Sequence, residues 1–214
     1  MKHANSNRLY QFLEWVMWMM YLNILWMAGV LLGIGIFGLF PAILALVITI
    51  REWRMQGDQV KFTKVFFSAW KQHFFIANSF GLIYLLIGYI LYIDFYWIVD
   101  LQSSLRVLFV VFFFVFLIMY IVSFLYVFPV YAHFKTSFIK TIKHATILGI
   151  FSPFMTIMII VLIIGLQYLW RWIPGLIPVI SISVIAFLTT RLALIAFEQF
   201  ESKQQYLNKK ISNQ

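Results

Sequence analysis

The side chains that could do chemistry in this 214-residue chain are few and scattered. The four histidines, at positions 3, 73, 133 and 144, lack the spacing of a metal-binding helix, and the chain has no cysteine to act as a nucleophile or zinc ligand. A glycine-rich phosphate loop and a grouping of serine, histidine and aspartate are also missing from the sequence. We therefore expect no catalytic residue, no metal site and no cofactor, and we predict that the protein is not an enzyme.

The remaining candidates lie inside the first long apolar run and are polar or conformationally special: Asn23, Trp26, Gly33, Gly38 and Pro41. A polar group inside a membrane is costly and is often functional, and a break rich in glycine and proline can line a solute site. These residues could therefore form a small pocket. The simpler interpretation is packing, with Asn23 in an interhelical hydrogen bond and the break in a tight hairpin turn. The runs carry no Asp, Glu or His near their middle, which favours packing.

The elements that would position these residues are long apolar helices. Apolar residues make up 64% of the chain, charged residues 11%, and the mean hydropathy is +0.94. About 20 apolar residues cross a bilayer, so we predict an all-α, polytopic membrane helical bundle of about six transmembrane helices, forming a single domain over residues 1–214. The second span is short for a full crossing. The expected spans are about 12–32, 39–53, 79–98, 107–128, 153–171 and 177–197, with a polar cytoplasmic tail over 198–214.

The net charge of +9 is distributed unevenly between alternate loops. If the N-terminus is cytoplasmic, nearly all lysines and arginines fall on the cytoplasmic side, and only Arg106 and Arg171 fall in loops on the other side. This asymmetry follows the positive-inside rule and predicts a multi-pass membrane protein with both termini in the cytoplasm. The basic character is thus explained by topology, so we expect a bilayer with anionic headgroups as partner and no nucleic acid.

Two basic segments between spans, 61–74 and 131–150, place aromatic residues and lysines on opposite sides of a helix. Such helices are expected at the cytoplasmic interface of the membrane. They could simply lie among the lipid headgroups, or they could form a docking surface for a partner. The candidate contact residues for a partner or lipid are Phe66, Trp70, Lys71, Phe138, Ile142 and Lys143.

Short motifs follow one another along residues 10–200 in an order that resembles the YesL family of bacterial membrane proteins, also called the domain of unknown function 624. The motifs are Asn23-Ile-Leu-Trp26, the break up to Phe40-Pro41-Ala42, Arg51-Glu-Trp-Arg54, Phe67-Ser-Ala-Trp70 with Phe74-Phe75, and Phe128-Pro129-Val-Tyr131. The resemblance implies a plasma-membrane protein whose relatives are often encoded beside carbohydrate uptake systems of the binding-protein ABC type. It supplies no catalytic or binding residue.

Three functions remain open on this basis. The first is a non-enzymatic accessory or regulatory protein of carbohydrate ABC uptake, with importer subunits as possible partners. The second is a small-solute transporter with a pocket near Asn23 and Trp26, and the third is a lipid-interacting membrane scaffold. The sequence sets neither a substrate nor the oligomeric state.

Overall fold

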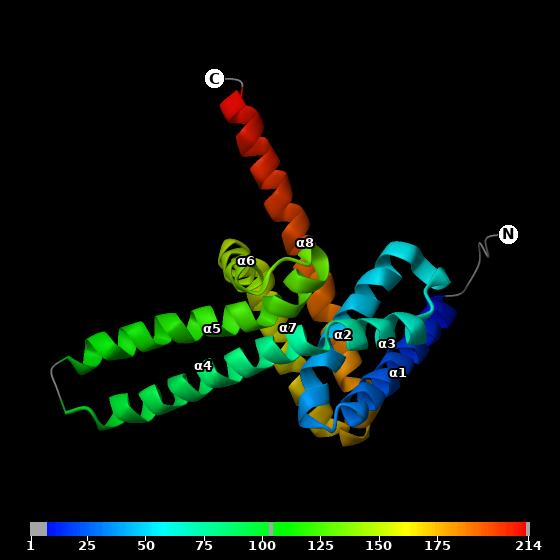
Figure 1. The fold of residues 1–214 in the computed structure, drawn as a ribbon, viewed down its shortest axis with the longest axis horizontal. Helices are drawn as coiled ribbons and strands as arrows, with labels where there is room; N and C mark the ends of the chain where they lie inside the picture. The colour runs from blue at the N-terminus through cyan, green and yellow to red at the C-terminus, as the bar shows by residue number, and fades with distance from the viewer. Residues whose placement is uncertain (1–7, 103–104, 213–214) are drawn as a thin grey trace. The chain divides into compact units, whose positions relative to one another are not determined.

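A computed structural model describes residues 8–102 and 105–212, with side chains described except at 58 and 201–212. Within these ranges every regular element is a helix (Figure 1). The elements are α1 (Arg8–Leu32), α2 (Ile36–Gln56), η1 (Gly57–Gln59), α3 (Phe62–Gln72), α4 (Phe74–Asp100), α5 (Arg106–Phe134), α6 (Phe138–Phe151), α7 (Pro153–Trp172), η2 (Pro174–Leu176) and α8 (Ile177–Ser212).

Six helical segments of the described chain are long and apolar enough to cross a membrane, which confirms the expected all-α membrane fold. They comprise α1, α2, α4, α5, α7 and the segment Pro174–Phe200, which includes the first part of α8. The prediction of a short second span is wrong. The helix α2 contains 21 residues, about 31 Å at a rise of 1.5 Å per residue, and this matches the roughly 30 Å of a hydrocarbon core.

The fourth span and the basic segment after it also differ from the prediction. The predicted span ends at about 128, but Pro129 lies inside α5, which continues to Phe134. The backbone then turns at Lys135, which has a positive φ of 47° and donates its N–H to the Tyr131 carbonyl over 2.9 Å. A new helix begins at Phe138. The predicted basic helix over 131–150 is therefore two helices, because the left-handed residue interrupts it.

The chain divides into two compact units. The first consists of Met1–Phe74 with Ile160–Thr190, and the second of Phe75–Ile159 with Arg191–Gln214. In the first unit, α2 is the central helix, and its segment from Leu44 to Ile50 is buried throughout. In the second, α4 and α5 form a long hairpin whose two helices run side by side (Figure 1), and α6 packs on α5. The expectation of a single membrane domain stays a prediction.

Candidate functional site

The break in the first apolar run forms a tight helical hairpin within the first unit. The turn occupies Gly33 to Gly35, where the N–H of Gly35 bonds to the Val30 carbonyl over 2.9 Å. A Cβ atom on Gly33 would lie 2.1 Å from Gly38 Cα, and one on Gly38 would lie 2.4 Å from the carbonyl oxygen of Val30. The backbones of α1 and α2 are therefore in direct contact. Pro41 is buried inside α2, so this segment is a hairpin with close helix packing and not a discontinuous helix around a solute.

Asn23 joins two helices of the first unit. Its side chain is 1% exposed. Asn23 Nδ2 donates to the carbonyl oxygen of Pro178 over 2.7 Å, and Asn23 Oδ1 accepts from the N–H of Ser183 over 3.3 Å. Both partners belong to the first turns of α8. The side-chain amide of Asn23 thus donates one hydrogen bond to α8 and accepts another from it, as expected of interhelical hydrogen bonding.

Trp26 follows Asn23 by three residues on α1, but unlike Asn23 it has a side-chain donor that is not used. The indole Nε1 of Trp26 is buried and makes no hydrogen bond to the described residues. A buried donor without an acceptor costs about 1–3 kcal/mol. Among the five candidates for a pocket, Trp26 is the one that retains unused hydrogen-bonding capacity, whereas Asn23 and the two glycines are engaged in packing.

The apolar face of α3 is covered by protein. Phe66 is fully buried, and its ring lies 3.1 Å from the position of a Cβ atom on Gly29 of α1. Phe62 packs against Trp18, with ring centroids 4.5 Å apart, and against Trp53 of α2 at 5.5 Å. The expectation that Phe66 belongs to a contact surface is therefore wrong, because this face of the helix is part of the core of the first unit.

The other residues expected on the outside of α3 differ in exposure. Lys71 is exposed, and Trp70 is half-buried with its ring centroid 5.0 Å from that of Phe74. The indole Nε1 of Trp70 is buried without a partner among the described residues. Lys71 alone of the three residues predicted here remains free to meet a partner or a headgroup through its charge.

The helix α6 is likewise attached to its neighbours through its apolar side. The ring of Phe138 stacks on Phe80 of α4, with centroids 4.5 Å apart and planes at 16°. Ile142 lines a cavity of the second unit together with Thr146. Lys143 is exposed. Phe138 and Ile142 thus contribute to packing within the second unit, and the lysine faces away from it.

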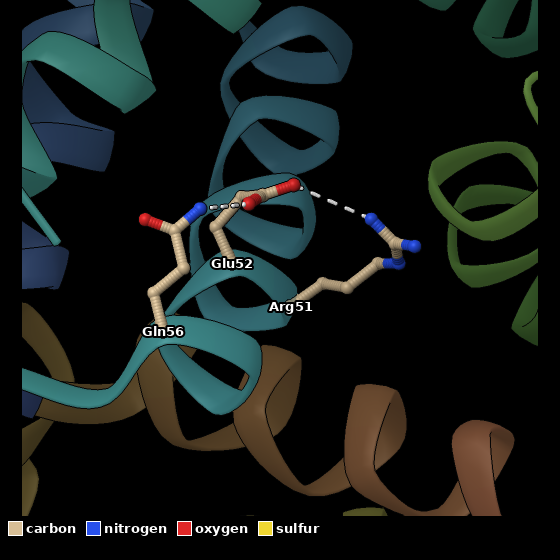
Figure 2. Close-up of polar contacts among 3 residues, drawn as sticks. All are labelled: Arg51, Glu52 and Gln56. Atoms are coloured by element: carbon tan, nitrogen blue, oxygen red, sulfur yellow. Dashed lines mark hydrogen bonds and ion pairs between the residues drawn. The ribbon is translucent and has the colours of Figure 1, made fainter.

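A polar cluster lies at the end of α2 and is shown in Figure 2. Arg51 Nη1 lies 3.3 Å from Glu52 Oε1, and Gln56 Nε2 donates to Glu52 Oε2 over 2.8 Å. The ion pair neutralises part of the positive charge that follows the second span. Because orientation depends on the number of lysines and arginines and little on acidic residues, the predicted orientation of the chain is unchanged.

The hairpin of α4 and α5 contains a polar pair that the sequence interpretation missed. The hydroxyls of Tyr84 and Ser123 hydrogen-bond to each other in a buried position. Tyr120 donates its hydroxyl to the Tyr84 carbonyl over 3.1 Å, and a Cβ atom on Gly88 would lie 2.8 Å from the Tyr120 oxygen. Tyrosine and serine in separate apolar runs give no periodic signal, so only the fold reveals their pairing. Among the described residues there is no group of three His, Cys, Asp or Glu that could hold a metal ion.

The described helices define a multi-pass helical membrane protein. The family described as "Protein of unknown function, DUF624" matches residues 19–95. In Bacillus subtilis (strain 168), the uncharacterized protein YteU is 33% identical over 210 residues, which cover 96% of this chain and 94% of YteU. YesL is 29% identical over 205 residues, covering 96% and 97%, and YesV is 28% identical over 210 residues, covering 95% and 98%. The chain therefore belongs to the DUF624 family. No solved structure matches it.

Proposed function

We propose that this protein is a non-enzymatic accessory or regulatory component of carbohydrate ABC uptake in a bacterial plasma membrane. Its family supports the association, because the resemblance to YesL implies relatives encoded beside uptake systems of this type. The contact surface we propose is the basic face of α3, formed by Lys64 and Lys71 of the helix together with Lys61, the residue that precedes it.

The observation that carries this proposal is the way in which α3 is held. Its apolar residues Phe62 and Phe66 are buried in the first unit, while Lys61, Lys64 and Lys71 are exposed. At 3.6 residues per turn these lysines lie on the side opposite the buried rings. A helix resting only on lipid would bury its apolar face in the bilayer, whereas this face is fixed on α1 and α2. The lysines are therefore presented from a rigid support, which lowers the entropy cost of binding a partner.

The partner that fits this surface is an acidic patch on a cytoplasmic part of an importer subunit. Complementary charges steer association and fix register more than they increase affinity. We therefore expect an association that weakens as salt rises, because exposed charges are screened beyond about 8–10 Å at physiological ionic strength.

Co-purification from native membranes in mild detergent tests the proposal. The chain should recover a permease or ATPase subunit of an importer, and the triple variant Lys61→Gln, Lys64→Gln, Lys71→Gln should lose it. The matched control changes the same number of charges in the second unit, at Lys135, Lys140 and Lys143. Recovery of the chain without any importer subunit would contradict the association, and equal losses in both variants would contradict the assignment to α3.

A lipid-interacting scaffold is the second candidate, because the same exposed lysines can meet anionic headgroups. It predicts that the purified chain retains anionic phospholipid, and that the retention disappears near 1 M salt, where the screening length falls to about 3 Å. A scaffold would keep its lipid in the absence of importer subunits. The small-solute transporter is less well supported, because Asn23, Gly33 and Gly38 serve helix packing.

A further inference from the structure

A cavity of about 680 Å³ lies between α4 and α5, entirely within the second unit. Four polar side chains of its lining are already hydrogen-bonded, Tyr84 with Ser123, and Tyr120 and Thr146 with backbone carbonyls. The cavity therefore suits an apolar occupant. Its walls are formed mainly by aliphatic and aromatic side chains, including Ile87, Ile90, Phe112, Phe113, Phe116 and Met119.

The shape of this cavity limits what can enter it. Its lining on α4 extends from Ile83 to Ile98, about 22 Å along a helix with a rise of 1.5 Å per residue. Spread over that length, the volume corresponds to a mean cross-section of about 30 Å², which accommodates a single extended alkyl chain. A helix of a second copy, about 10–12 Å across, could lie only at its opening.

Aromatic contacts between the two helices close the cavity near both ends. The ring of Tyr84 lies 5.3 Å from that of Phe124, and the ring of Trp97 lies 5.3 Å from that of Phe109. These ring pairs hold α4 and α5 apart, so the space between them persists. The side chains around this space lack contact partners on one side.

The cavity is open along the hairpin surface. Phe112 and Phe116 line it and yet keep 53% and 60% of their surface exposed. Because α4 and α5 are both candidate membrane spans, this opening is expected to face hydrocarbon. An alkyl chain could then enter sideways from the bilayer without crossing water.

We propose that the cavity between α4 and α5 binds one acyl chain of a membrane phospholipid. The single charged residue among its described lining residues is Asp94, which would repel the carboxylate of a free fatty acid. The headgroup of phosphatidylethanolamine carries an ammonium group beside its phosphate, which an acidic side chain attracts, and its acyl chains are already in the surrounding hydrocarbon. The site is independent of the proposed association with an importer.

Photolabelling tests this site in the full chain. The protein is reconstituted into phosphatidylethanolamine vesicles that contain the same lipid with a diazirine in the middle of one acyl chain. The protein is then washed in mild detergent with unlabelled lipid, which replaces loosely held lipid at the outer surface. Illumination should label Ile87, which lines the cavity, several-fold more than Leu86, its exposed neighbour outside the lining at nearly the same depth. Equal labelling of the two positions would overturn the proposal.

Two matched variants extend the test. Ile87→Trp fills the cavity and should abolish the labelling of Phe112 and Phe116. Leu86→Trp is the control: because leucine and isoleucine have the same composition, it adds the same atoms, but outside the lining, and the labelling of Phe112 and Phe116 should remain. Unchanged labelling in folded Ile87→Trp would overturn the proposal, and if this variant fails to fold, the contrast between positions 86 and 87 in the natural chain decides. The competing occupant is a helix of a second copy of this chain. Because the chain has no cysteine, Phe116→Cys introduces a single thiol that can form a disulfide between two copies that meet at the cavity. A disulfide-linked dimer together with unlabelled cavity residues would also overturn the proposal.

Discussion

Gly33 and Gly38 bring two helix backbones into contact at the turn of the first hairpin. A Cβ atom on Gly33 would lie 2.1 Å from Gly38 Cα, closer than real Cβ contacts allow. Small residues allow helices to approach closely in a membrane, where van der Waals packing contributes much of the association energy. The hairpin of α1 and α2 thus depends on the absence of side chains at these two positions.

The first prediction is that Gly38→Ala destabilises the protein. The added Cβ atom would lie 2.4 Å from the Val30 carbonyl oxygen and 2.7 Å from that of Gly29, and these backbone atoms cannot move without shifting α1. Overpacking of this kind costs about 1–3 kcal/mol or more. Thermal unfolding in mild detergent should show a lower midpoint.

The control for this change is Gly165→Ala. Gly165 lies in α7, and nothing lies within 4 Å of the position its Cβ atom would take. Because alanine favours helix over glycine by about 1 kcal/mol, the control should be neutral or slightly stabilising. A Gly38 variant as stable as this control would contradict the close contact between α1 and α2.

The second prediction concerns Ile34, which has a φ of 56° in the turn between the helices. Its N–H bonds to the Leu31 carbonyl over 3.1 Å, and the N–H of Gly35 bonds to Val30, which together end α1. A β-branched residue in the left-handed region is strained by about 1–2 kcal/mol. The side chain is 88% exposed, so little packing depends on it. Ile34→Gly should therefore raise the unfolding midpoint.

The reverse change at the adjacent position serves as the comparison. Gly35 has a φ of 72°, and Gly35→Ala meets no neighbouring atom, so its effect reports backbone conformation alone. This variant should lose about 1 kcal/mol of stability. If Ile34→Gly is destabilising, or if Gly35→Ala is stabilising, the left-handed turn is not the conformation that ends α1.

The third prediction is that Asn23→Leu weakens the packing of α1 against α8. Leucine shares the branched shape of asparagine at Cγ, although it is larger, and it cannot bond to Pro178 or Ser183. Interhelical hydrogen bonds in membranes contribute about 0.6 kcal/mol on average and up to about 1–2 kcal/mol. Titration with a denaturing detergent should detect a loss in this range. Thr49→Val is the control, since the Thr49 hydroxyl bonds within its own helix to Ala45 and should be nearly neutral.

The sequence predicts the helices of this protein well and their contacts less well. Long apolar runs identify spans, and the cluster from Gly33 to Pro41 identifies a turn. The amphipathic pattern around Phe66 likewise identifies an apolar helix face. That pattern does not reveal whether protein or lipid covers the face, because both are equally apolar. The pattern therefore predicts Phe66 at a surface, although it is buried in the structure.

The start of α2 and the α4–α5 cavity could not be derived in the same way. The start of α2 at Ile36 depends on the close contact of Gly38 with α1. The glycines in the sequence predict a turn, but they do not predict this contact or the residue at which the next helix begins. The cavity depends on the distance between two helices, set by pairs such as Tyr84 with Phe124. Residues so distant along the chain carry no periodic signal of their contact.

The fourth prediction concerns orientation in the membrane. The distribution of lysine and arginine predicts that the loops after α2 and α5 lie in the cytoplasm and the loops after α4 and α7 lie outside. Reporter fusions after Gly57 and Ile139 should therefore give a cytoplasmic signal, and fusions near Leu101 and Gly175 an external one. A reversed pattern would contradict the orientation. The fusion at Gly57 also tests whether α2, with its 21 residues, crosses the membrane completely. An external signal at this position alone would mean that α2 ends on the outside, the side on which it begins.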